Sequence, residues 1–397
     1  MLDFMFQWPT KLIFGKDSRL KIGEALDGTA SKVLLVCAKG PFRENGRFNE
    51  IKQSLTAQGI EVFEMGDIDQ NPRLSSVREG VSICKEQRID CVVALGGGSA
   101  MDCTKLIAGA ALYNDDPYEF IWGSRKPIER SLKTVMLPTI AATGTETNPS
   151  AVIVNDDTKE KFYCDCKHPY LTIFDPVLTA SAPYRLVVWG AMDILSHTFE
   201  FYFNGYEGAE FQSRLSEAII LSVMEALNHL HENPKDLTSL GELQWCAAMA
   251  WGGLAGIGRL PPEMTCHWIE ESFSGYFDTH HGACLGVLTP RWMELVYRDK
   301  PSIFARFARN VMQVQNSDDN AAALEGIRRY VGWLKSVEAP DTFSDIGANE
   351  FSDAGLEHVA KTAWRIYGGN IGKLRKMSCD ECLALLKAGR IPLFPQA

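Results

Sequence analysis

Four side chains in the second half of the sequence are of the types that hold a transition metal ion. Asp193 and His197 lie four residues apart in an apolar stretch, 185–203, that is predicted to form a buried helix. Residues at this spacing share one helical face about 6 Å apart along the axis, so both can reach one ion. His267 and His281 follow fourteen residues apart. One carboxylate and three imidazoles suit Fe²⁺, Zn²⁺ or Mn²⁺. The net charge of the site with a bound dication is then near +1, which leaves the ion able to polarise a substrate oxygen. An isolated Asp/His pair is more often a structural hydrogen bond, so the metal hypothesis depends on all four residues.

Two loops rich in small residues follow predicted strands and could hold a dinucleotide. The first, Gly96–Asp102 (GGGSAMD), opens a helix, whose N-terminus offers free N–H groups and a positive dipole end to a pyrophosphate. It is neither Gly-x-Gly-x-x-Gly nor a Walker A loop, and by itself a tight turn explains it equally well. The second, Pro138–Glu146 (PTIAATGTE), also follows a strand. Both loops leave the carboxyl ends of strands, where ligands bind in parallel sheets, and together they favour a cofactor site.

The elements that position these residues fall into two parts. Up to about residue 180, short β-branched runs alternate with amphipathic segments, which is the pattern of a parallel sheet covered by helices. The predicted strands are 11–14, 32–37, 61–65, 91–95, 134–137 and 171–174, and the helices between them are 46–58, 74–87 and 100–112. Beyond residue 183 the periodicity predicts helices over 213–230, 239–256, 321–336 and 354–367, and one over 282–295 that should break or kink at Pro290. We expect an α/β plus all-α protein with domains 1–182 and 183–397.

Composition excludes several classes of protein. The 397 residues carry a net charge of −10, with 46% hydrophobic and 23% charged residues, which is typical of a folded globular chain. No basic stripe offers itself to nucleic acid, and no apolar run approaches the roughly 20 residues of a membrane span. The odd count of eleven cysteines, with no leader-like start, predicts reduced thiols and a cytoplasmic location.

Taken together, the motifs resemble the iron-containing (group III) alcohol dehydrogenase family, and most closely its butanol dehydrogenase branch. The resemblance covers nearly the whole chain and rests on Pro9–Lys16, Asn71–Arg73, Gly96–Asp102, Ala142–Glu146, Asp193–Glu200, the spacing of His267 and His281, and Gly368–Arg375. It implies a dehydroquinate-synthase-like fold: a Rossmann-like dinucleotide-binding domain, then a helical metal-binding domain, with the active site in the cleft between them. It also implies a homodimer.

The resemblance further implies roles for individual residues. Asp193, His197, His267 and His281 match the family's four metal ligands. Gly97, Gly98 and Ser99 match its pyrophosphate loop; Asn71, Thr139, Thr143, Lys161 and Leu178 match other dinucleotide contacts, and Asp102 falls near the nicotinamide end. In this class the metal, with Fe²⁺ favoured over Zn²⁺ or Mn²⁺, binds the oxygen of a short to medium primary alcohol or aldehyde while hydride moves to or from the nicotinamide.

One position departs from the family pattern. Many members carry a histidine for proton transfer four residues after the ligand matched by His267, whereas this chain has Glu271. Glu271 shares a helical face with His267, so it could relay a proton or approach the metal. Equally, it could line the pocket while water carries the proton.

The dinucleotide type depends on the end of the second strand. An acidic side chain there would bind the ribose 2′-hydroxyl and repel a 2′-phosphate. The sequence instead has Ala38, Lys39 and Arg43, which are compatible with phosphate. We therefore expect NADP(H) in preference to NAD(H).

Two alternatives share these features. A lyase of the dehydroquinate-synthase type would have the same fold, but it needs basic residues around the metal for a phosphorylated substrate. The segments that flank the ligands are apolar or acidic, with Trp189, Trp268 and Glu270 among them. A family member that binds nucleotide without turnover is favoured only by Glu271.

Overall fold

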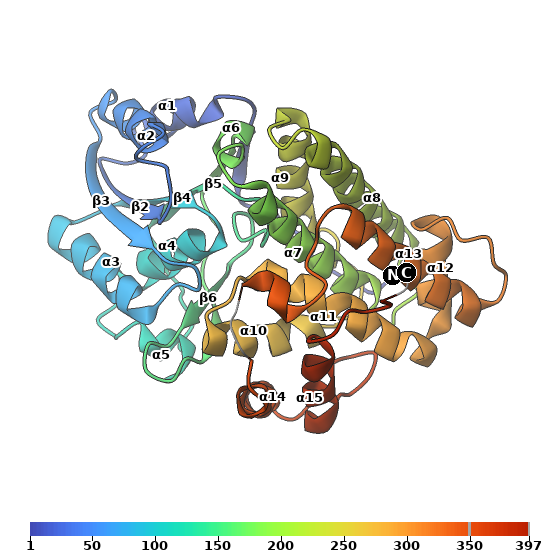
Figure 1. The fold of residues 1–397 in the computed structure, drawn as a ribbon. Coiled ribbons are helices and arrows are strands. Elements are labelled where there is room, and N and C mark those ends of the chain that lie inside the picture. The colour runs from blue at the N-terminus through green and yellow to red at the C-terminus, as the bar shows by residue number, and fades with distance from the viewer. Residues whose placement is uncertain (348–350, 396–397) are drawn as a thin grey trace. The chain divides into compact units, whose positions relative to one another are not determined.

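The computed structural model describes residues 1–347 and 351–395, which divide into two compact units (Figure 1). The sheet unit comprises Gln7–Pro183 and Asn233–Ala248. The helical unit comprises Met1–Phe6, Tyr184–Glu232 and Met249–Ala397. The two units interleave along the sequence, since residues 1–6 belong to the helical unit and residues 233–248 to the sheet unit. The domain boundary between residues 182 and 183 stays a prediction.

The sheet unit is built on six parallel strands. In spatial order they are β1 (Lys11–Phe14), β8 (Leu171–Phe174), β5 (Lys133–Pro138), β4 (Cys91–Gly96), β2 (Lys32–Ala38) and β3 (Glu61–Ile68). Every neighbouring pair in this order is parallel. The α/β part of the predicted fold class is thus confirmed, with β3 running further than the expected end at residue 65.

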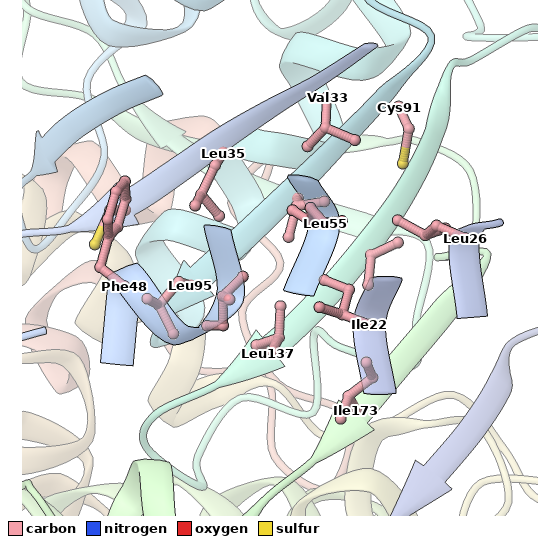
Figure 2. Packing of buried hydrophobic residues seen from close by; sticks show 14 of the residues in the cluster. Ile22, Leu26, Val33, Leu35, Phe48, Leu55, Cys91, Leu95, Leu137 and Ile173 are labelled. Atoms are coloured by element: carbon pink, nitrogen blue, oxygen red, sulfur yellow. The ribbon is translucent and has the colours of Figure 1, made fainter. Parts of the chain in front are cut away.

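Helices cover both faces of this sheet (Figure 1). α1 (Ile22–Leu26) and α2 (Arg47–Thr56) lie on one face, and α3 (Leu74–Gln87) and α4 (Gly98–Ala110) on the other. Alternate residues of a strand point to the same face, so Val33 and Leu35 both pack under α1 and α2 (Figure 2). Burial of both faces explains why β2 and β4 are nearly continuous apolar runs.

A two-stranded hairpin was not predicted. β6 (Ser150–Val154) pairs antiparallel with β7 (Lys161–Asp165), and Asn155 turns the chain between them, its Oδ1 accepting from the N–H groups of Asp157 and Thr158. β7 begins and ends on charged residues, so its pattern is weak in the sequence. The hairpin brings Lys161 back toward the sheet.

The helical unit confirms the all-α part of the prediction. Its principal helices are α7 (Tyr184–Tyr202), α8 (Glu210–Glu232), α10 (Thr265–Phe277), α11 (His281–Val296), α12 (Pro301–Asn310), α13 (Asp319–Ser336), α14 (Asp353–Ile366) and α15 (Cys379–Ala388), while α9 (Leu237–Trp251) starts in the sheet unit. Of the predicted break or kink at Pro290, the break is wrong, because α11 continues through this residue. Pro290 and its helical neighbours are buried, and this packing outweighs the lost backbone hydrogen bond.

The close approach of α11 to α7 depends on a glycine. A Cβ atom on Gly282 would lie 2.0 Å from the carbonyl oxygen of Trp189 and 3.2 Å from the Cβ atom of Asp193. Backbone cannot yield as a flexible side chain would, so any larger residue pushes the two helices apart. Because His281 precedes Gly282 at the start of α11, this contact also sets where His281 sits.

We predict that Gly282→Ala destabilises the metal-free protein by about 1–3 kcal/mol through overpacking. Gly332→Ala is a matched control, because Gly332 is exposed in α13 and its added methyl group would meet no atom within 4 Å. The control should gain up to about 1 kcal/mol in helix propensity. Thermal unfolding followed by circular dichroism measures both. A Tm change of the same sign in the two variants would contradict the steric argument.

Candidate functional site

The four predicted metal ligands meet in the helical unit. The Oδ1 atom of Asp193 lies 3.4 Å from Nδ1 of His197, 3.5 Å from Nε2 of His267 and 3.6 Å from Nε2 of His281. Asp193, His197 and His267 are buried, and their nearest donor atoms all lie within 4.8 Å of one another. The carboxylate of Asp193 is therefore the common point of the cluster.

Three helices supply these side chains. α7 carries Asp193 and His197 one turn apart, α10 carries His267 near its N-terminus, and α11 begins at His281. α11 packs against both α7 and α10. Residues far apart in sequence are thus held together by helix packing.

The cluster fits a divalent cation. Oδ1 of Asp193, Nδ1 of His197 and Nε2 of His267 are buried, and within the described part of the chain they have no hydrogen-bond partner. Buried polar atoms without partners are costly and rare. An ion bound among them would satisfy all three, and the mixture of one carboxylate with imidazoles suits Fe²⁺ or Zn²⁺.

Two carboxylates that the sequence analysis did not single out support the histidines. Nδ1 of His267 donates to Oε1 of Glu200 over 2.7 Å, and Nδ1 of His281 donates to Oε2 of Glu270. Both glutamates are buried. The signal was present, because Glu200 follows Asp193 and His197 at positions i+7 and i+3 of one helical face.

Burial and charge shift the pKa values of the cluster in different directions. Burial lowers the pKa of His197 to about 3. Burial alone would also lower the pKa of His267, but the nearby carboxylates of Glu200 and Asp193 outweigh it and raise the pKa to about 10. Burial opposes the ionisation of Asp193, yet the facing histidines hold its pKa well below the usual range. A metal ligand must be deprotonated, so a metal ion and a proton compete for His267.

Aromatic rings enclose the cluster. The indole of Trp251 stacks on the His197 ring with centroids 4.6 Å apart, and the His197 ring stacks on that of His267 at 4.4 Å. On the other side of α10, Trp268 stacks on Tyr367 at 4.4 Å. The surroundings are therefore apolar rather than basic.

Glu271 lies on α10 one turn beyond His267 and is buried. The hydroxyl of Tyr367, at the C-terminal end of α14, donates a hydrogen bond to Oε2 of Glu271. Tyr367 was not predicted as a site residue. Ninety-six positions separate it from Glu271, so no local pattern connects the two.

In the sheet unit, the two predicted loops lie against each other at the carboxyl edge of the sheet. Gly97 is the N-cap of α4, and a Cβ atom on Gly98 would lie 2.7 Å from the side chain of Thr143. The N–H of Thr139 donates to the carbonyl oxygen of Gly96 over 3.0 Å. With Ser99 in the first turn of α4, the free N–H groups of a helix start face a loop of small residues, the arrangement that holds pyrophosphate.

The other predicted dinucleotide contacts are only partly brought together. Nζ of Lys161 donates to Oδ1 of Asn71 over 3.0 Å, and both residues are buried. Leu178 packs within the hydrophobic core under α1 and α2. Lys39 is exposed after β2, with its Nζ 3.4 Å from Oδ1 of Asp69. Contact of these residues with a dinucleotide stays a prediction.

A buried lysine that was not predicted fixes the second loop. Nζ of Lys105 on α4 donates to the carbonyl oxygens of Thr145 (3.0 Å), Asn148 (3.2 Å) and Ser150. Asp102, predicted to lie near the nicotinamide, accepts from the Thr145 hydroxyl and, over 2.9 Å, from the N–H of Val152. These bonds hold residues 145–152 against α4, so Asp102 has a structural role whether or not it contacts a cofactor.

Comparison with known proteins identifies the class. Residues 9–176 match the iron-containing alcohol dehydrogenase family, and residues 187–389 match the C-terminal domain of the Fe-containing alcohol dehydrogenase family. The chain therefore belongs to the iron-containing alcohol dehydrogenase family. It is an oxidoreductase of that class, with a Rossmann-like sheet domain and a helical domain, for which a nicotinamide dinucleotide and a divalent metal ion are the implied cofactors.

Particular relatives cover almost the whole chain. NADH-dependent butanol dehydrogenase A of Clostridium acetobutylicum is 34% identical over 391 residues, covering 98% of this chain and 99% of the relative. The crystal structure of NADH-dependent butanol dehydrogenase A from Thermotoga maritima superposes with a TM-score of 0.93 at 33% identity, covering 98% and 99% of the two chains. The NADPH-dependent aldehyde reductase YqhD of Escherichia coli is 28% identical, covering 87% of this chain and 90% of the relative.

Proposed function

We propose that this protein interconverts short to medium primary aldehydes and alcohols, acting mainly as an aldehyde reductase. The observation that carries the proposal is the convergence of His197, His267 and His281 on the buried carboxylate of Asp193. These four residues would hold a divalent ion, with Fe²⁺ favoured. The ion would supply a Lewis acid for the substrate oxygen, and the nicotinamide would supply or accept hydride.

The side chains around the cluster favour a neutral substrate. Trp251 covers the imidazoles of His197 and His267 from one side. Two carboxylates, Glu200 and Glu270, touch His267 and His281. A phosphorylated substrate, which the lyase alternative requires, would be repelled by this surround.

We further propose that the dinucleotide lies along the N-terminus of α4, in contact with Gly97, Gly98 and Ser99. The other residues that we propose as dinucleotide contacts are those that match the family's contacts: Asn71, Asp102, Thr139, Thr143, Lys161 and Leu178. NADPH is favoured over NADH because residues 38–43 contain no acid, while Lys39 and Arg43 are exposed. Their ion pairs with Asp69 and Glu64 are surface pairs, which contribute little and exchange readily. Among the relatives, butanol dehydrogenase A is NADH-dependent and the aldehyde reductase YqhD is NADPH-dependent.

Assembly and location are also proposals. Five of the first six residues are exposed apolar side chains, with Met5 96% exposed, and a second copy of the chain would cover them as a homodimer. The particle mass in solution tests whether the chain forms a homodimer.

Within the described residues no helix is both long and apolar enough for a membrane span, and all eleven cysteines are free thiols. We propose a cytoplasmic location, which cell fractionation would check.

Turnover with butanal tests the proposed activity. Anaerobic protein loaded with Fe²⁺ should consume NADPH or NADH when butanal is added, and Asp193→Ala should fall below about 1% of that rate because the common carboxylate is lost. Reconstitution with Zn²⁺ or Mn²⁺ in parallel tests the preference for iron. Absence of turnover with both dinucleotides in a folded, metal-loaded protein would overturn the proposal, and phosphate release from a sugar phosphate would favour the lyase.

A charge reversal at Lys39 tests the preference between NADPH and NADH. Lys39→Glu should lower the ratio of kcat/KM for NADPH to that for NADH by about tenfold, since a carboxylate would repel the 2′-phosphate. Lys133→Glu is a matched control, because Lys133 is exposed at the amino end of β5, the opposite edge of the sheet. An unchanged ratio in Lys39→Glu would show that this lysine does not face the 2′ position.

Substitution of Glu271 separates its two possible roles, as a proton relay or as a residue that lines the pocket. If Glu271 relays the proton, Glu271→Gln should lower kcat about 10²-fold and change its pH profile, because the amide cannot exchange a proton. Tyr367→Phe should have a smaller effect, since it removes only the hydrogen bond to Glu271. A raised KM for butanal with unchanged kcat would instead place Glu271 in the wall of the pocket, with water carrying the proton.

A further inference from the structure

Two buried glutamates, Glu200 and Glu270, each bind a histidine on another helix of the metal cluster. Glu200 on α7 accepts from Nδ1 of His267 on α10, and Glu270 on α10 accepts from Nδ1 of His281 on α11. Thus α7 supplies the carboxylate that holds the histidine of α10, and α10 supplies the carboxylate that holds the histidine of α11. His197 differs, because its own Nδ1 faces Asp193 and its ring is held by stacking on Trp251.

These bonds determine which nitrogen faces the cluster. An imidazole that donates from Nδ1 to a carboxylate presents its Nε2 lone pair in the opposite direction. In both His267 and His281 the Nε2 atom is the one directed at Asp193, at 3.5 and 3.6 Å. In each histidine, one ring nitrogen is thus bonded to a glutamate and the other is directed at Asp193.

We infer that Glu200 and Glu270 are positioning residues for the metal ion, fixing the tautomer and ring orientation of His267 and His281. This inference rests on the metal centre of the proposed function. It also changes the charge of the site: a dication with ionised Asp193 carries a net charge near +1, and the two glutamates, when ionised, bring it to about −1. They therefore both orient the donors and increase the attraction of the site for a cation.

Substitution by alanine and by glutamine separates these two contributions. Glu200→Ala and Glu270→Ala remove both the acceptor and the charge, and each should weaken Zn²⁺ binding 10- to 100-fold. Glu200→Gln and Glu270→Gln keep an acceptor oxygen but lose the charge, so they should weaken binding less. The dissociation constant is measured by competition with a chromophoric chelator, without any turnover.

Two further measurements exclude a merely structural effect. Co²⁺ absorption reports ligand geometry, and its visible bands should shift in the alanine variants and stay close to wild type in the glutamine variants. Glu217→Gln is the matched control: Glu217 is buried in the same unit and accepts from Tyr202 and Arg306, but it touches none of the four proposed ligands. It should lower Tm while leaving the Zn²⁺ dissociation constant within about twofold.

The outcomes distinguish this inference from the proposal beneath it. Wild-type protein that binds no Zn²⁺, Co²⁺ or Fe²⁺ would overturn the metal centre itself. Wild-type binding with an unchanged dissociation constant in folded Glu200→Ala and Glu270→Ala would overturn the positioning role alone. If the alanine variants do not fold, the glutamine variants decide. An unchanged Zn²⁺ dissociation constant in both of them, or a loss of Zn²⁺ affinity in Glu217→Gln as large as theirs, would do the same.

Discussion

The helical unit depends on one buried carboxylate. Asp193 sits where α7, α10 and α11 meet, and three imidazoles approach the same oxygen atom from these helices. Burying a carboxylate and leaving donor atoms unpaired costs free energy that the fold tolerates only where a function requires it. The steric contact at Gly282 and the stacking of Trp251 both keep this point compact. The cluster therefore fits the proposed divalent cation, which would satisfy the buried donor atoms that have no partner within the described residues.

The surrounding charges limit which substrates can approach. Glu200 and Glu270 touch the histidines, and the indole of Trp251 stacks on the ring of His197. A low-dielectric site with excess negative charge disfavours anionic substrates and leaves neutral carbonyl compounds as the class that can enter at little electrostatic cost. In the proposed metal centre the same charges would also hold the cation. Metal retention and selection for neutral substrates would then come from the same two side chains.

Much of this arrangement could be predicted from local sequence, and the remainder could not for a definite reason. The parallel strands follow from β-branched runs such as 91–95, and the spacing of Asp193 and His197 already places them on one face of α7. The β6–β7 hairpin was missed because charged residues end its second strand. Continuity of α11 through Pro290 and the bonds of Glu200, Glu270, Lys105 and Tyr367 are tertiary effects, set by partners on other elements.

Buried charges also fix loops elsewhere in the molecule. Lys105 holds the loop after β5 through three backbone carbonyl groups, and Glu263 accepts from the N–H groups of Lys373 and Leu374 over 2.8 and 2.6 Å. Burial raises the pKa of Glu263 to about 7, so its carboxyl group gains no stability from ionising in the fold. Such groups cost free energy in isolation, and what they gain is a single backbone conformation. Lys105 holds the segment after β5 beside the proposed dinucleotide loop, and Glu200 and Glu270 hold the histidines of the proposed metal site. Such pre-organisation is what transfer of a hydride between two bound partners requires.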